Sequence, residues 1–192
     1  MYPSKLLTVV GKLSVKVQSK VEHEIMELKA KVHDLEVVRR RLSHLGARLV
    51  GTFRQIDVYF NVLEGRLKLR EVDGKNNAEL IYYERDNTAG PKRSKVVILK
   101  IQDPKVFKNL LKRLLKTTAI VEKVREIYRY QGTQIHLDTV EKLGNFVEFE
   151  RKMPAGELVA KRNQRILEKL MEKLGINPNT LEKLSYSDLI HT

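Results

Sequence analysis

The chain has 192 residues, of which 42% are hydrophobic and 32% are charged, and it contains no cysteine. This composition is typical of a globular domain, and it excludes disulfides, cysteine-ligated zinc and thiol nucleophiles. The 37 lysines and arginines exceed the 24 acidic residues, and the formal net charge of +13 favours a polyanionic partner. No apolar run has the length of a membrane span, so we expect a cytoplasmic protein without a membrane partner.

Residues 1–20 contain four lysines and no acidic residue, and we interpret them as a basic N-terminal extension. The rest of the chain, residues 21–192, is expected to form a single domain that includes the C-terminal helices.

The first predicted helix runs from Asp34 to Ala47, because Leu35, Val38 and Leu42 follow helical spacing behind Asp34 as N-cap. Strand-like segments follow at about 50–60, 66–72 and 78–85, and the apolar run 96–99 comes next. A second helix is predicted from Asp103-Pro104, and a third over 157–174. A tail at 184–190 can pack back onto the domain.

The second helix repeats the first at a distance of 69 residues. This shift superposes Asp34 on Asp103, and further along the chain it superposes Asp57 on Glu126 and Tyr59 on Tyr128. Each half then consists of a strand, a helix and three strands. Two such β-α-β-β-β halves supply eight strands, a number suited to a closed antiparallel barrel in an α+β fold.

Four segments alternate apolar with charged residues: 27–31, 66–70, 123–125 and 148–150. As strands, each would have one apolar and one ionic face. The ionic faces could meet water, or they could line the lumen of the barrel. We favour the lumen, because three amphipathic helices need an apolar outer surface to cover, and an eight-stranded barrel has no room for them inside.

These segments together resemble the CYTH superfamily, also called triphosphate tunnel metalloenzymes, from Glu24 to Ile190. Residues 26–32, MELKAKV, are similar to the family's E-x-E-x-K signature, and residues 185–189 resemble its C-terminal ending. The most specific match is residues 137–150, LDTVEKLGNFVEFE. The resemblance implies an eight-stranded tunnel with a charged lumen that binds a nucleoside triphosphate, or another organic or inorganic triphosphate, together with Mg²⁺ or Mn²⁺.

The resemblance also implies roles for individual residues. The expected metal ligands are Glu27, Glu148 and Glu150, with Glu24 as a further candidate. The expected phosphate-binding residues are Lys31, Lys68, Arg70, Arg85, Arg93, Lys123 and Arg125. The expected catalytic pair is Lys29 as general base, oriented by Tyr59.

Two positions depart from the family pattern. Ile25 stands where the first glutamate is expected, and Glu24 would need a β-bulge near Ile25 to reach the lumen. Without that bulge the site lacks one metal ligand, and this loss would affect catalysis rather than triphosphate binding. Tyr83 stands where many members carry lysine, and Arg85 on the same strand face is expected to compensate.

Some site assignments have structural alternatives. Tyr59 could simply pack, Glu148 and Glu150 could form salt bridges with Lys123 or Arg125, and His136 could be polar lining of the lumen.

The nearest activity implied is that of class IV adenylyl cyclases, which convert ATP to cyclic AMP and pyrophosphate. The alternatives are a tripolyphosphatase or thiamine triphosphatase, and a non-catalytic polyphosphate or nucleotide binder. Nucleic acid is not an expected partner, because aromatic residues make up only 6% of the chain and do not form a stacking platform. The oligomeric state is open and includes a homodimer.

Overall fold

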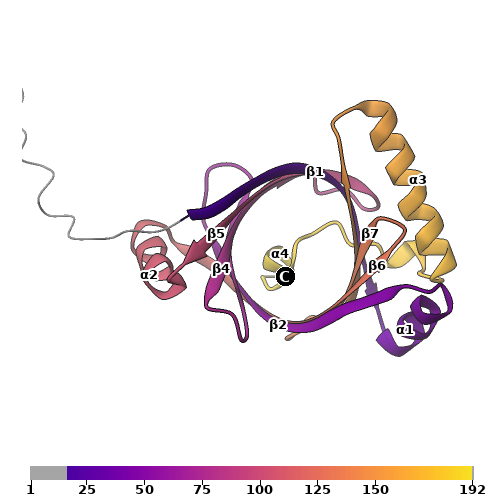
Figure 1. The fold of residues 1–192 in the computed structure, drawn as a ribbon, viewed down its shortest axis with the longest axis horizontal. Helices are drawn as coiled ribbons and strands as arrows, with labels where there is room; N and C mark the ends of the chain where they lie inside the picture. Colours follow the sequence, from indigo (N-terminus) through magenta and orange to yellow (C-terminus); the bar gives the residue numbers. More distant parts are fainter. Residues whose placement is uncertain (1–16, 192) are drawn as a thin grey trace, which may run out of the picture.

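The computed structural model describes residues 17–191, in which eight strands close into an antiparallel barrel (Figure 1). The strands are β1 (Val17–Val32), β2 (Arg48–Phe60), β3 (Arg66–Val72), β4 (Asn77–Arg85), β5 (Lys92–Gln102), β6 (Thr117–Tyr130), β7 (Thr133–Val140) and β8 (Gly144–Met153). The helices are α1 (Leu35–His44), α2 (Pro104–Leu114), α3 (Glu157–Lys173) and α4 (Tyr186–Leu189), with a 3₁₀ turn at Pro178–Thr180. Around the barrel the strand order is β1-β5-β4-β3-β2-β6-β7-β8, and β8 pairs with β1.

The predicted barrel and its two β-α-β-β-β halves are confirmed by this element order. Residues 1–16 of the predicted extension lie outside the described residues, and β1 runs across the expected boundary at residue 21. Among residues 17–191, no helix has both the length and the apolar character that crossing a membrane requires.

The 69-residue sequence repeat aligns α1 with α2. In the strands that follow, residues 69 positions apart lie on opposite faces of the barrel wall. Asp57 and Tyr59 point into the lumen, whereas Glu126 binds Arg39 of α1 and Tyr128 lies in the outer core. Pairing between β2 and β6 shifts twice, at Val50, where β2 contains one additional residue, and at Thr118, where β6 contains one. Asp57 and Glu126 lie on opposite strand faces, so these sequence equivalents are not structural equivalents.

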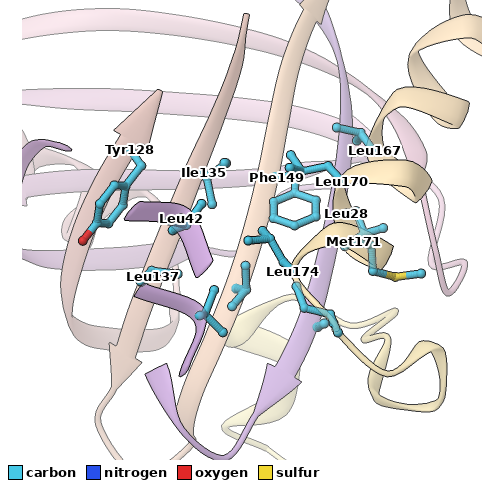
Figure 2. Close-up of a cluster of buried hydrophobic side chains, with 14 of the residues drawn as sticks. Leu28, Leu42, Tyr128, Ile135, Leu137, Phe149, Leu167, Leu170, Met171 and Leu174 are labelled. Atoms are coloured by element: carbon cyan, nitrogen blue, oxygen red, sulfur yellow. The ribbon is translucent and has the colours of Figure 1, made fainter. Parts of the chain in front are cut away.

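The apolar strand faces point outward and are covered by helices. Leu28, Phe149 and Ile135 pack with residues of α1 and α3, as Figure 2 shows for the labelled residues Leu42 and Leu167. A second outer cluster joins Val58, Leu69 and Ile101 of the barrel to Leu111 of α2. Helices α1, α2 and α3 therefore cover the outside of the barrel, as predicted, and the opposite strand faces line the lumen.

Of the two aspartates that precede predicted helices, only Asp34 caps its helix with its side chain. The Asp34 side chain accepts a hydrogen bond from the Glu36 N–H at 2.7 Å, as an N-cap does. Asp103 precedes α2 with φ of 56° and makes no such bond, so α2 begins at its proline without a side-chain cap.

Candidate functional site in the barrel lumen

The basic side chains of β3 and β6 converge on one acidic residue inside the barrel. Alternation sends Lys68, Arg70 and Lys123 inward, and all three bind Asp57, which is fully buried. Arg70 donates two hydrogen bonds to the carboxylate at 2.7 and 2.8 Å, Lys68 Nζ lies 3.0 Å from it and Lys123 Nζ 2.9 Å. A single carboxylate is thus shared by three cations.

Burial and the contacts between Asp57 and these cations shift the pKa values of the carboxyl group and of both lysines. Burial alone would raise the pKa of Asp57, but Arg70, Lys123 and Lys68 together hold it well below its usual range. Burial, aided by Arg70 and opposed by Asp57, lowers the pKa of Lys68 to about 8. Burial also lowers the pKa of Lys123 to about 7, against the attraction of Asp57. The site therefore holds more positive charge than one carboxylate can neutralise, an arrangement suited to an anion.

Arg125 links this basic cluster to the acids of β7 and β8. It donates two hydrogen bonds to Asp138 at 2.7 and 2.5 Å and one to Glu148 at 2.6 Å. Burial would raise the pKa of Glu148, but Arg125, His136 and Lys29 hold it well below its usual range. The salt-bridge alternative is therefore realised for Glu148 with Arg125, and it leaves the carboxylate charged and directed into the lumen.

The acidic residues of β1 and β8 lie beside this group. Glu27 is 3.1 Å from Arg85, and burial raises its pKa. One ligand atom each of His136, Glu148 and Glu150 lies within 4.8 Å of the others. Carboxylate oxygens are the ligands that Mg²⁺ and Mn²⁺ prefer, so the donor set present at this wall of the lumen fits a divalent cation.

Lys29 and Tyr59 do not form the predicted pair. Lys29 Nζ donates a hydrogen bond to the Leu184 carbonyl at 2.9 Å and lies 4.0 Å from the ring centre of Tyr186. Tyr59 O–H instead lies 3.4 Å from Lys68 Nζ, and burial raises its pKa well above 10. Burial, more than neighbouring cations, lowers the pKa of Lys29. The residue placed next to Lys29 is Tyr186, which sequence reasoning did not select.

The C-terminal segment occupies one end of the lumen. In Figure 1, α4 lies within the outline of the barrel, and Tyr186 packs there against Tyr59 and Phe146. Its O–H donates to Asp138 at 2.8 Å. Lys92, also missed from the sequence, donates to the carbonyl of Glu182 at 3.1 Å. The predicted return of the tail is thus confirmed, and it narrows this end of the tunnel.

Two of the predicted site residues, Glu24 and Arg93, point away from the lumen, and a third, Lys31, lies exposed at its end. The pairing of β1 with β5 and β8 is regular from Glu24 to Glu27, so the bulge considered near Ile25 is absent. Glu24 consequently points outward, where it binds Arg93 at 2.9 Å, and Ile25 points into the lumen. Lys31 is exposed, with its Nζ 5.8 Å from the centre of the Phe146 ring.

The charged lumen also contains an apolar strip, which the sequence analysis did not predict. Ile25, Ile81, Val96 and Ile98 form an apolar strip on β1, β4 and β5, with Tyr83 packed beside it. A single cavity is lined by this strip and by Lys29, Arg70, Arg85, Glu148 and Glu150. The cavity therefore has one ionic and one apolar wall.

Asp57 and Asp138 are functional candidates that the sequence reasoning did not choose. Each is completely buried, and each binds at least one lumen arginine. Strand alternation could have predicted that both point into the lumen, because Asp57 lies two residues from Tyr59 and Asp138 lies two residues from His136, on the same strand faces.

Known proteins are similar to this chain in sequence and in fold. A sequence profile of the CYTH domain matches residues 23–186. A Methanocaldococcus jannaschii protein provisionally named an adenylate cyclase is 28% identical over 181 residues, covering 85% of this chain and 97% of that protein.

Solved structures show the same fold. The PH1012 protein of Pyrococcus horikoshii superposes with a TM-score of 0.76 at 26% identity, covering 86% of this chain and 98% of its own. A Hippeastrum protein provisionally named an adenylyl cyclase, and described as having a dominant triphosphatase activity, has a TM-score of 0.60 at 16% identity, covering 88% of this chain and 93% of its own.

Proposed function

Because the chain belongs to the CYTH domain family, we propose that it binds a triphosphate in the barrel lumen and cleaves it with the help of a divalent metal ion. The observation that carries the proposal is the convergence of the buried Lys68, Lys123 and Arg125 and the half-buried Arg70 with buried acids inside one closed barrel. Burying charge is costly unless the charges are paired, and a surplus of buried cations is stabilised when a polyanion binds.

The residues divide into two groups by chemistry. The side chains that contact phosphate oxygens in this proposal are Lys68, Arg70, Lys123 and Arg125. The carboxylates that hold Mg²⁺ or Mn²⁺ are those of Glu27, Glu148 and Glu150. When bound, the ion supplies charge neutralisation on the phosphate oxygens. Arg125 connects the two groups, because it already contacts Glu148 and lies on the same face of β6 as Lys123.

The apolar strip favours an organic triphosphate over tripolyphosphate. Ile25, Ile81, Val96 and Ile98 border the same cavity as Arg70 and Arg85. An inorganic anion has no apolar part to bury there, whereas a nucleoside or thiamine triphosphate does. We therefore propose a class IV adenylyl cyclase-type reaction on ATP as the first candidate.

Triphosphatase activity is the second candidate, and the loss of one expected ligand favours the alternative of a binding module without turnover. Ile25 and the outward position of Glu24 leave fewer carboxylates in the lumen than the family pattern implies. Water and a ribose 3′-hydroxyl can attack a phosphate held by the same cations, so these residues fit both reactions.

Incubation with ATP, tripolyphosphate or thiamine triphosphate, each with Mg²⁺ and with Mn²⁺, separates the candidates. Cyclic AMP with pyrophosphate identifies the cyclase, orthophosphate identifies the triphosphatase, and binding without turnover identifies a binding module. We expect Glu148→Ala to abolish metal-dependent turnover, while Glu24→Ala, at the outward position on β1, keeps it. Equal activity in the two variants would contradict the assignment of Glu148 as a metal ligand.

A further inference from the structure

The acidic wall of the lumen contains one nitrogen donor that the proposed metal site does not yet use. We propose that Nδ1 of His136 is a ligand of the divalent cation held by Glu148 and Glu150, and that the site consequently takes Mn²⁺ in preference to Mg²⁺. This inference rests on the proposed function, because it concerns the same metal ion.

Strand pairing places the three donors together. In the β7–β8 ladder His136 lies opposite Glu148, and Gln134 lies opposite Glu150. Nδ1 of His136 is 3.7 Å from Glu148 Oε2 and 3.7 Å from Glu150 Oε1. Two ligands about 2.1 Å from one ion lie about 3.0 Å apart when adjacent and about 4.2 Å when opposite. The observed separations fall in this range, are longer than hydrogen bonds, and are also those of an ion pair with a protonated imidazole.

Burial makes His136 an unusual lining residue. It is 1% exposed, and among the residues that the structure describes its Nδ1 has no hydrogen-bond partner. A buried polar atom without a partner costs free energy comparable to a lost hydrogen bond, so such atoms are rare. The atom is aimed at two carboxylates, and an ion bound between them would supply its missing partner.

The other ring nitrogen is held as in many metal-binding histidines. Nε2 of His136 lies 2.7 Å from the side-chain amide of Gln134. The amide nitrogen of Gln134 faces the ring and donates to Nε2 in this orientation; with the amide turned by 180°, its oxygen accepts from the Nε2 N–H and the lone pair of Nδ1 points into the lumen. An acceptor that binds the ring nitrogen opposite the metal fixes both the tautomer and the orientation of a ligating imidazole.

The donor set determines which ion fits. Glu24 points outward, Ile25 occupies the lumen position next to it, and Glu27 is paired with Arg85. The donors grouped at this wall are two carboxylates, of which that of Glu148 also accepts a hydrogen bond from Arg125, and one imidazole. Mg²⁺ strongly prefers oxygen ligands, whereas first-row transition ions such as Mn²⁺ accept an imidazole nitrogen readily. A nitrogen ligand therefore shifts the selectivity of the site toward Mn²⁺.

Pulsed electron paramagnetic resonance of the full-length protein loaded with Mn²⁺, without any triphosphate, tests the inference directly. We expect a ¹⁴N coupling typical of a bound imidazole, replaced by a ¹⁵N coupling in protein grown with ¹⁵N-labelled histidine. We also expect His136→Gln to lose the coupling and to bind Mn²⁺ at least about tenfold more weakly. Mg²⁺ affinity should change less.

The matched control is His23→Gln, because His23 lines the same cavity but is not grouped with the two glutamates. This variant should retain the nitrogen coupling. The labelled wild-type protein keeps the test decisive even if His136→Gln does not fold. The role of His136 is overturned if Mn²⁺ binds without a nitrogen coupling, or if the coupling is lost only in His23→Gln. In either case the metal-dependent turnover of the proposed function is not contradicted. Failure of Mn²⁺ to bind overturns the inference and the metal dependence of the proposed function together.

Discussion

Oδ2 of Asp57 lies 2.9 Å from Nζ of Lys123, and both side chains are withdrawn from solvent. Lys68 and Arg70 bind the same carboxylate. Without Asp57, the cations of Lys68, Arg70 and Lys123 would face one another across the lumen with no counter-charge from this strand. Asp57 therefore stabilises the ligand-free barrel in the place where a triphosphate is expected to bind.

Replacing Asp57 with asparagine should consequently destabilise the free protein much more than the liganded one. Removing one member of a buried ion pair costs about 3–5 kcal/mol, because the remaining charges lose their partner. Bound tripolyphosphate would neutralise the same cations, so we expect it to raise the melting temperature of Asp57→Asn more than that of the wild type. Thermal unfolding with and without tripolyphosphate measures both effects.

Glu126→Gln is the control for this prediction. Glu126 is the sequence-repeat equivalent of Asp57, but it lies on the outer face and pairs with Arg39. Its removal should cost about 1 kcal/mol or less, with no special recovery from tripolyphosphate. The role of Asp57 would be contradicted if tripolyphosphate stabilised both variants and the wild type equally.

Alternation within each strand was sufficient to predict which residues share a face, and it correctly separated Leu67 and Leu69 from Lys68 and Arg70. It could not predict how two strands relate across a loop. Arg85 and Arg93 both have odd numbers, yet Arg85 points inward and Arg93 outward. The loop 86–91 between β4 and β5 exchanges the faces, and its geometry is set by long-range pairing rather than by local residue pattern.

The repeat did not predict strand faces either, because Asp57 points inward whereas its sequence equivalent Glu126 points outward. The partners of the charged lumen residues could not be predicted from the sequence for a related reason. That Asp57 would meet Lys123 of β6, or that Tyr186 would meet Lys29 of β1, depends on barrel closure and on the path of the C-terminal segment. No spacing rule within a strand contains that information.

Triphosphate binding should take up protons at about pH 8. Lys123 has a pKa of about 7 and Lys68 a pKa of about 8, so above these values both are increasingly neutral in the free protein. A bound anion favours the charged lysines and raises their pKa. Protons are therefore taken up on binding, and affinity should fall as the pH rises from about 7 to about 9. Calorimetry of tripolyphosphate binding in buffers of different ionisation enthalpy measures the number of protons.

Lys123→Arg provides the comparison, since arginine stays charged throughout this pH range. The ionisation of tripolyphosphate itself is common to both proteins, so the difference in proton uptake isolates Lys123. We expect a smaller uptake and a flatter pH dependence in the variant. Identical uptake in the two proteins would show that Lys123 is already charged before the ligand binds.

The apolar strip should distinguish organic from inorganic substrates. Ile98 is half-buried on the lumen face of β5, opposite Ile81. Its truncation to alanine removes three carbon atoms from that wall, worth up to about 2 kcal/mol of apolar contact with a buried organic group. We expect Ile98→Ala to weaken ATP binding by up to about 30-fold and to leave tripolyphosphate binding unchanged, as measured by competition calorimetry. Ile120→Ala on the exposed face of β6 should affect neither ligand. If Ile98→Ala weakens both ligands equally, the strip stabilises the barrel but does not contact the substrate, and the preference for an organic triphosphate loses its support.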